Sequence, residues 1–141
     1  MARFAKTWML GVAIAAVAAG SVVGCGGGDD ADDGGSDQNA VEQVMSDLQT
    51  ASREGDGERI CNQIFTPKLS NSVTRASSTG SCATEVKSKL FSPETQIEVQ
   101  NVSVPDEANA TATVKESNGN TSTVFLVKQS GRWRIRSVTP A

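Results

Sequence analysis

Histidine and tyrosine are both absent from this chain of 141 residues, which has only three cysteines and 4% aromatic residues. Without histidine, the common zinc and copper sites lack their usual ligands, so we expect no metal site. Ser-His-Asp and Cys-His catalysis are excluded as well, because histidine is their general base. We therefore expect no catalytic residue and no cofactor.

The chain also lacks a large excess of charge of either sign. The chain has 13 Lys and Arg against 16 Asp and Glu, a formal net charge of −3 at pH 7. A nucleic-acid-binding protein usually has a basic excess, so this balance argues against a nucleic-acid partner. The length allows one domain with appendages rather than two domains.

Residues 1–24 have the parts of a secretory signal peptide. Arg3 and Lys6 form a basic head, and no residue from 8 to 24 is charged. As a helix this uncharged run would span about 26 Å, less than the roughly 30 Å hydrocarbon core of a bilayer. A cleaved signal peptide is therefore favoured over the alternative, a permanent membrane anchor.

The end of this segment, Val22-Val23-Gly24-Cys25, resembles the lipobox of bacterial lipoproteins. The resemblance implies that the Cys25 thiol receives a diacylglycerol, that residues 1–24 are removed, and that the new N-terminus is acylated, for example with palmitate. Two or more chains would hold the protein stably on the extracytoplasmic side of the cell membrane, since each buried methylene contributes about 0.8 kcal/mol. The alternative is a chance cysteine behind a general secretory signal.

Residues 26–38 consist largely of glycine and aspartate and contain nothing that can build a core. Such a segment cannot bury enough surface to become ordered. With Cys25 it is predicted to form a flexible tether, residues 25–38, with a mean span of about 20 Å. Its aspartates could instead form a weak calcium site, but no glutamate closes an EF-hand loop, so a solvated spacer is favoured.

The remaining residues, 39–141, are predicted to form a single α+β domain with its helices first. Apolar residues recur at helical spacing at its start: Val41, Val44, Met45, Leu48 and Ala51. The sequence Glu54-Gly55-Asp56-Gly57 ends this helix, and Asp56 is suited to cap the next. A third helix begins at Thr66-Pro67, and Ser81 caps a last turn or two whose apolar face is Cys82, Val86 and Leu90.

After Pro93 the apolar period changes to two, which predicts four strands at residues 97–104, 109–116, 121–128 and 132–138. The alternation slips at Gln100-Asn101, which indicates a bulge and a bent first strand. Short turns join the strands, so an antiparallel meander is expected. The predicted architecture is N-terminal helices packed on a curved antiparallel sheet.

The turns set the predicted register. Asn118-Gly119 favours a two-residue turn that pairs Ala112 with Phe125, and a three-residue loop ending in Gly131 pairs Val127 with Trp133. One face then holds the expected core, which would also line any pocket: Ala110, Ala112, Val114, Phe125, Val127, Trp133 and Ile135. The opposite face carries Lys128, Arg132, Arg134 and Arg136 beside Val124 and Leu126. A solvated outer face is favoured there over an anion-binding site.

Cys61 and Cys82 remain after Cys25 is assigned to lipid. Two remaining cysteines in an exported chain predict a disulfide. The alternative, a redox-active pair, lacks the Cys-x-x-Cys spacing that lowers a thiol pKa.

The order of these elements resembles the superfamily of nuclear transport factor 2. The resemblance rests on the first helix ending at Glu54-Gly55-Asp56, the Cys61 and Cys82 pair, and the closing strand Gly131-Arg132-Trp133-Arg134-Ile135. It implies a sheet wrapped around a helix to form a cone whose mouth holds a ligand. Members include ketosteroid isomerases, polyketide cyclases and many lipid-anchored actinobacterial proteins of unknown function.

Three functions are compatible with this sequence. The leading hypothesis is a non-catalytic domain, anchored outside the cell membrane, that binds a partner protein or a small apolar ligand. The second is an isomerase-like or dehydratase-like enzyme. Enzymes of that superfamily use Asp, His or Tyr for proton transfer, and here Glu116 is the one acid expected at the inner face. The third is a structural module for envelope assembly.

Overall fold

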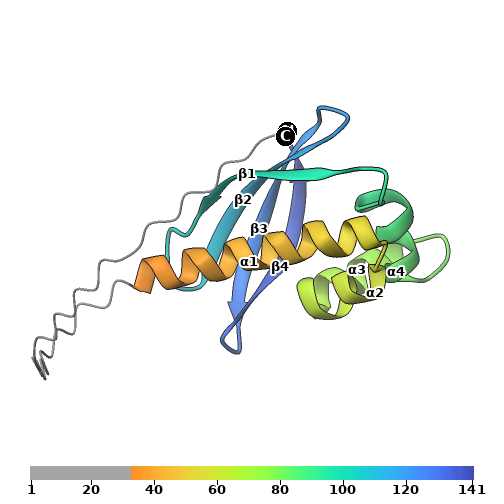
Figure 1. Cartoon of the computed structure of the whole chain (residues 1–141). Helices are drawn as coiled ribbons and strands as arrows, with labels where there is room; N and C mark the ends of the chain where they lie inside the picture. The colour runs from red at the N-terminus through yellow and green to blue at the C-terminus, as the bar shows by residue number, and fades with distance from the viewer. Residues whose placement is uncertain (1–32) are drawn as a thin grey trace, which may run out of the picture. The chain divides into compact units, whose positions relative to one another are not determined.

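The computed structural model describes residues 33–141, which form an α+β fold with a four-stranded antiparallel sheet (Figure 1). The helical elements are α1 (Asp33–Glu54), α2 (Gly57–Arg59), the π-helical turn η1 (Ile60–Ile64), α3 (Pro67–Ala76), α4 (Cys82–Glu85) and the π-helical turn η2 (Val86–Leu90). The strands are β1 (Ile97–Ser103), β2 (Asn109–Glu116), β3 (Thr121–Gln129) and β4 (Arg132–Pro140). The predicted signal peptide, the lipidation site Cys25 and tether residues 26–32 lie outside the described residues. None of the helices in the described part is long and apolar enough to cross a bilayer.

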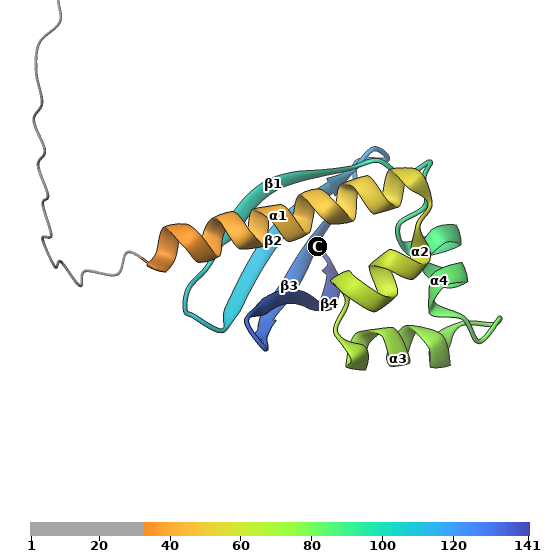
Figure 2. The same ribbon diagram turned by 60° about the horizontal axis from the view of Figure 1, so that its bottom comes forward.

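Helix α1 lies across one face of the sheet (Figures 1 and 2) and begins earlier than the sequence predicts. The predicted tether extends to residue 38, but residues 33–38 are already helical. Asp37 explains the difference, because its carboxylate accepts hydrogen bonds from Lys128 and Trp133. A segment without apolar residues is thus ordered by polar contacts with the sheet.

The apolar stripe of α1 is confirmed. Val41, Met45, Leu48 and Ala51 are all 0% exposed, and Val44 packs against the same core. Burying a Leu or Met side chain completely contributes roughly 1.5–3 kcal/mol to folding. These residues hold α1 against the inner face of the sheet. The core lies wholly within the unit Ala31–Ala141, which therefore has what an independently folding domain needs.

The predicted caps Asp56 and Ser81 are confirmed, and Thr66, predicted only as the start of a helix, caps α3 as well. The side chains of Asp56, Thr66 and Ser81 accept hydrogen bonds from the backbone N–H of Arg59, Leu69 and Thr84, respectively. One detail of the helical prediction is wrong. Leu90, at the end of the π-helical turn η2, does not share the buried face of Cys82 and Val86 but is 44% exposed.

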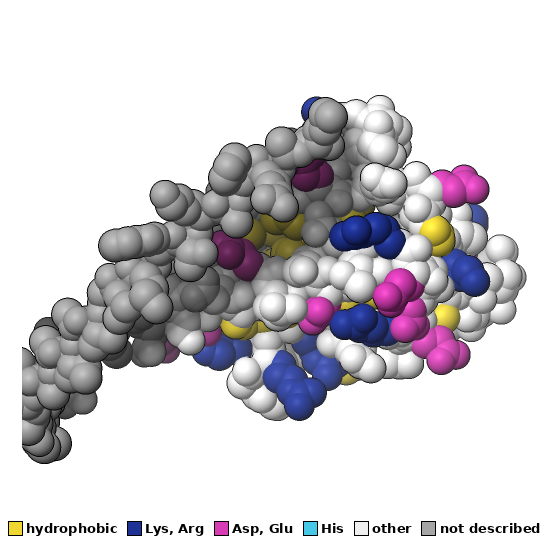
Figure 3. All heavy atoms as spheres, viewed as in Figure 1, with side chains coloured by type: hydrophobic (Ala, Val, Ile, Leu, Met, Phe, Trp, Pro, Cys, Tyr) yellow, Lys and Arg dark blue, Asp and Glu magenta, His cyan; other side chains and the backbone are white. Residues whose placement is uncertain are grey.

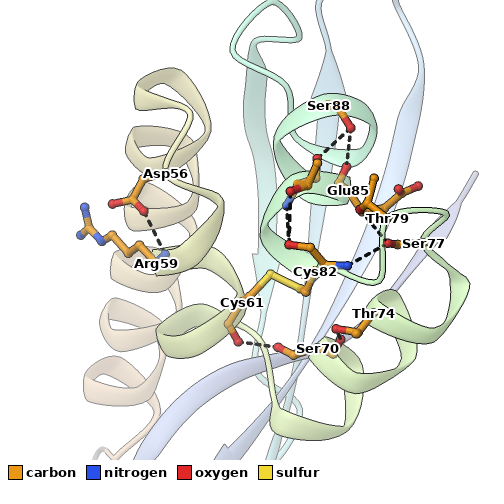
Figure 4. Close-up of a disulfide and its surroundings, with 12 residues drawn as sticks. Asp56, Arg59, Cys61, Ser70, Thr74, Ser77, Thr79, Cys82, Glu85 and Ser88 are labelled. Atoms are coloured by element: carbon orange, nitrogen blue, oxygen red, sulfur yellow. Dashed lines mark hydrogen bonds between the residues drawn. A yellow bond between two sulfur atoms is a disulfide. The ribbon is translucent and has the colours of Figure 1, made fainter.

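A disulfide joins Cys61 in η1 to Cys82 at the start of α4, with 6.2 Å between their Cα atoms (Figure 4). This confirms the predicted bond. Around it, the Ser70 hydroxyl of α3 donates a hydrogen bond to the Cys61 carbonyl, so three helical segments meet at one point. The bond fixes α4 against η1 and thereby fixes the helical layer.

The strands follow each other in the order β1-β2-β3-β4, all antiparallel. Val99 pairs with Val114 and Asn101 with Thr113, so Gln100 is the extra residue of a bulge in β1. The predicted slip is confirmed. A second bulge, which the sequence did not predict, leaves Arg136 unpaired in β4 between Ile135 and Ser137.

The β2–β3 turn differs from the prediction. Its loop has three residues, 117–119, because the Glu116 N–H bonds the Asn120 carbonyl at 2.8 Å. Gly119 takes the left-handed position at a φ of 90°. Ala112 therefore pairs with Val124 rather than with Phe125.

The β3–β4 turn differs in the opposite sense. Here the loop has two residues, Ser130 and Gly131, with φ of 50° and 75°, and Lys128 pairs with Trp133. Each turn differs from the prediction by one residue, and the two differences cancel between β2 and β4. The residues of β2 and β4 therefore lie on their predicted faces, whereas the residues of β3 lie on the face opposite to the predicted one.

The corrected register changes which residues of β3 are in the core. Val124 and Leu126 are 0% and 1% exposed, whereas Phe125 and Val127 lie half-buried on the outer face. Lys128, predicted on the outer face, lies on the inner one. The other members of the predicted inner face are buried as expected: Ala110, Ala112, Val114, Trp133 and Ile135.

Candidate functional site

A pocket of about 370 Å³ lies between one end of the sheet and the helical segments α3 and η2. Its walls are mostly apolar: Phe65, Leu69, Val73, Leu90, Phe91, Val114, Val138 and Pro140. Three polar side chains complete the lining: Lys89, Glu116 and Ser122. An apolar concave site with a few polar groups is the usual form of a small-molecule site, and this volume is near the lower end of the range.

The helical wall comes from α3 and the ends of both π-helical turns. Leu69 and Val73 stand one turn apart on α3 and therefore share a face. Phe65 follows η1 and forms an isolated bridge to Ile135 of β4, which brings α3 beside that strand (Figure 2). The rings of Phe65 and Phe91 meet edge to face at 6.2 Å and join the two helical segments.

The sheet wall comes from the inner faces of three adjacent strands. Val114 of β2 pairs with Ser122 of β3, and Ser122 pairs in turn with Pro140 of β4. Ser122 is 8% exposed and lines the pocket, and among residues 33–141 its hydroxyl has no hydrogen-bond partner. Since no buried polar side-chain atom lacks a partner among these residues, the hydroxyl is reached by solvent through the pocket. A ligand that displaces this solvent would have to replace its hydrogen bond, which marks the position as a place for a ligand atom.

The rim of the pocket combines an exposed apolar residue with charges of both signs. Leu90 is the only large hydrophobic side chain that is exposed in the described part of the chain. Lys89 forms an ion pair with Glu85 at 3.0 Å, and the Glu116 carboxylate accepts a hydrogen bond from Asn118 at 2.8 Å. The rim therefore offers neither a cluster of cations nor a cluster of anions.

Sequence reasoning identified part of this pocket. Glu116 and Val114, expected at the inner face, both line it. Ala110 and Ala112 are instead buried in the core beneath α1, 2% and 1% exposed. The helical wall was missed because residues 70–81 appear polar and irregular. The available signal was the spacing of four between Leu69 and Val73.

The opposite end of the sheet is polar. Asp37 accepts hydrogen bonds from Lys128 Nζ at 2.8 Å and from Trp133 Nε1 at 3.1 Å. The bond from Lys128 first, and that from Trp133 second, hold the pKa of Asp37 below its usual range. Lys128 also lies over the Trp133 ring, 5.8 Å from its centre. These contacts explain the half-buried Lys128 as a structural residue.

Charged side chains elsewhere do not gather into a site. On the face that carries α1, basic and acidic side chains are interspersed (Figure 3). Arg134 of the predicted arginine row donates to the Asn62 and Phe65 carbonyls, each at 3.4 Å, while Arg132 and Arg136 are exposed. Within residues 33–141, no three cysteine, aspartate or glutamate side chains lie together so that they could hold a metal ion.

No protein-family model, no curated protein and no solved structure matches this chain. The pocket itself is therefore the strongest indication of function in the described part of the molecule.

Proposed function

We propose that this protein is a lipid-anchored, extracytoplasmic domain that binds a small apolar ligand in the pocket without catalysing a reaction. The observation that carries the proposal is the apolar lining of a pocket of about 370 Å³ with Leu90 exposed at its rim. Apolar surface that remains open to water in a folded domain gains free energy when an apolar molecule covers it.

The sequence supports the anchored location. Val22-Val23-Gly24-Cys25 provides the lipidation motif, and only residues 26–32 separate Cys25 from the start of α1. Seven residues span at most about 25 Å. A domain held this close to a bilayer would exchange apolar molecules with it over a short distance.

The order of elements supports the resemblance to the superfamily of nuclear transport factor 2. Helices precede a bent β1 and an antiparallel meander, and α1 crosses one face of the sheet. The resemblance implies a ligand in the mouth of a cone formed by the sheet and a helix, and this pocket lies between one end of the sheet and helical segments. Membership in the superfamily is part of the proposal.

One observation favours a second candidate, an isomerase or dehydratase. Glu116, the acid that such an enzyme would require, lines the pocket. Proton transfer would also need a second acid or base facing it. The other polar lining groups are Lys89, which is paired with Glu85, and the neutral Ser122. Because binding needs no such partner, we favour binding.

A pair of valine substitutions tests the pocket. Val138→Phe fills the pocket from β4, whereas Val127→Phe adds the same bulk to the outer face. Residues 25–141 with Cys25→Ser contain the whole unit Ala31–Ala141 and need no detergent. The uncharged fluorophore N-phenyl-1-naphthylamine should bind the unaltered domain saturably. Val138→Phe should weaken this binding about tenfold or more, a loss of about 1.4 kcal/mol.

The control determines how the result is read. Val127→Phe should leave the affinity unchanged. Absence of saturable binding to the unaltered domain, or an equal loss in both variants, would contradict ligand binding in this pocket.

The anchor is tested on the full chain in a bacterial host. The exported protein should partition into detergent and carry acyl mass on Cys25, and Cys25→Ser should release it or halt its processing. A Cys25→Ser protein that is processed normally and stays membrane-bound would show that the anchor is something else.

A further inference from the structure

Building on the proposed ligand-binding function, we infer that the pocket selects uncharged amphiphiles, molecules with an apolar chain or ring and a single hydroxyl or carbonyl group. Two observations carry this inference: a pocket-facing hydroxyl on the sheet wall that has no partner among residues 33–141, and apolar walls in which a charged head group would lose its hydration.

Ser122 supplies the polar contact. Its side chain is 8% exposed, lies between Val114 and Pro140 on adjacent strands, and lines the pocket. Since the hydroxyl has no partner within residues 33–141, it is free to donate to a ligand oxygen. A purely apolar ligand would bury this hydroxyl without compensation, whereas an alcohol or ketone would satisfy it.

The apolar walls and the Glu116 carboxylate act against charged ligands. Glu116 lies two residues beyond Val114 on the same strand and therefore on the same face as Ser122, as a diagonal neighbour. A carboxylate ligand bound to Ser122 would be repelled by Glu116. An ammonium ligand at Ser122 would be attracted by Glu116 but would lose its hydration inside the apolar walls. An uncharged hydroxyl accepts from Ser122 and can donate to Glu116.

The volume sets the size of the ligand. One water occupies about 30 Å³ in the liquid, so about 370 Å³ holds roughly a dozen non-hydrogen atoms. A ten-carbon chain with one hydroxyl matches this number. Longer chains would leave the pocket over Leu90, which is exposed at the rim.

Four probes of one chain length test the selectivity: 1-decanol, decanoic acid, decylamine and decane. Each is titrated at pH 7 into residues 25–141 carrying Cys25→Ser, by displacement of N-phenyl-1-naphthylamine. 1-Decanol should bind most tightly, about threefold to tenfold more tightly than decane, because one hydrogen bond contributes roughly 0.5–1.5 kcal/mol. The acid and the amine should bind more weakly than the alcohol.

A serine substitution assigns the preference to a residue. Ser122→Ala should lower the affinity for 1-decanol about threefold to tenfold and leave that for decane unchanged or raised. Ser137→Ala on the outer face, opposite Phe125, should change neither. Thermal melts of both variants establish that the fold is retained.

The outcomes distinguish a failure of the proposed ligand binding from a failure of the inferred preference for uncharged amphiphiles. If none of the four probes displaces the fluorophore, the proposed function itself fails. If decane binds as tightly as 1-decanol, or the acid or amine binds most tightly, the pocket still binds ligands but the inference about uncharged amphiphiles is wrong. An equal effect of Ser122→Ala on decane and 1-decanol would also overturn it.

Discussion

The carboxylate of Asp37 accepts a hydrogen bond from Lys128 Nζ at 2.8 Å, and the two residues are 91 positions apart in the chain. The same Asp37 oxygen accepts from Trp133 Nε1 at 3.1 Å. These bonds attach the start of α1 to the β3–β4 hairpin. They place the end of the tether at the polar end of the sheet, away from the residues that line the apolar pocket.

The first prediction concerns the pH dependence of this contact. Because its folded-state pKa is lowered, Asp37 stabilises the fold above its unfolded pKa of about 3.9, and this stabilisation is lost as pH falls through the folded pKa. Asp37→Asn should therefore reduce the free energy of unfolding by a constant amount above about pH 5, and the difference should shrink below pH 4. Urea denaturation across this range measures it.

Lys128→Met removes the other partner of the same hydrogen bond and is compared with Asp37→Asn, alone and in the double variant. The effects of Asp37→Asn and Lys128→Met should be less than additive, because both remove the same hydrogen bond. Additive effects, or a difference between wild type and Asp37→Asn that does not change with pH, would show that the contact is not formed in solution.

The second prediction concerns Gly57, at the start of α2. A Cβ atom at this position would lie 2.2 Å from the Ala83 carbonyl oxygen. The backbones of α2 and α4 therefore lie so close together at this point that only glycine fits. Gly57→Ala should destabilise the fold by about 1–3 kcal/mol through overpacking. Gly35→Ala is the control, because a Cβ there meets nothing within 4 Å in helix α1. It should raise stability by up to about 1 kcal/mol, and chemical denaturation of both variants tests the pair.

The third prediction concerns the disulfide. Cys61 and Cys82 are 21 positions apart, and closing a loop of this size stabilises a fold by roughly 3 kcal/mol. Non-reducing peptide mapping should identify the Cys61–Cys82 bond, and a reductant should lower the melting temperature. Fluorophore binding should weaken in parallel, since the bond fixes the helical layer that forms one pocket wall. Free thiols in freshly exported protein would contradict this prediction.

The fourth prediction distinguishes packed core from pocket. Ala112 is 1% exposed and pairs with Val102 and Val124, both on the inner face of the sheet. Ala112→Leu should therefore overpack the core and cost about 1–3 kcal/mol in a thermal or chemical melt. Unchanged or increased stability would indicate a cavity beneath α1 that the described fold does not contain.

The helices were largely predictable because local chemistry determines them. The apolar stripe of α1 has helical spacing, and Asp56, Thr66 and Ser81 each cap a helix with their own side chain. Such features need no information from distant parts of the chain. The exposure of Leu90 was not predictable, because its spacing of four from Val86 is the spacing of a shared helical face.

The registers of the two hairpins were not predictable from the turn sequences alone. Lys128 was placed on the outer face because a three-residue loop pairs Trp133 with the apolar Val127 instead of with Lys128. Its partner, Asp37, lies in a segment whose composition predicts a flexible tether. The Lys128–Asp37 contact thus links the β3–β4 hairpin to the start of α1. The error in the β2–β3 turn came instead from Asn118-Gly119, which favours a two-residue turn where the loop has three residues.

The pocket was only partly predictable for a similar reason. Its sheet wall follows from strand alternation, as Val114 and Glu116 show. Its helical wall depends on how α3 and η2 lie against β4, which the bridge from Phe65 to Ile135 and the disulfide determine. Contacts between distant segments are not visible in local patterns.

The most direct test of the central claim is a titration of methyl-labelled domain, residues 25–141 with Cys25→Ser, with 1-decanol, followed by NMR. The account predicts saturable shifts in the methyl signals of pocket residues Leu69, Val73, Leu90 and Val138. The outer-face methyls of Val127 should not move. The absence of saturable shifts, or shifts centred on Val127, would contradict ligand binding in this pocket.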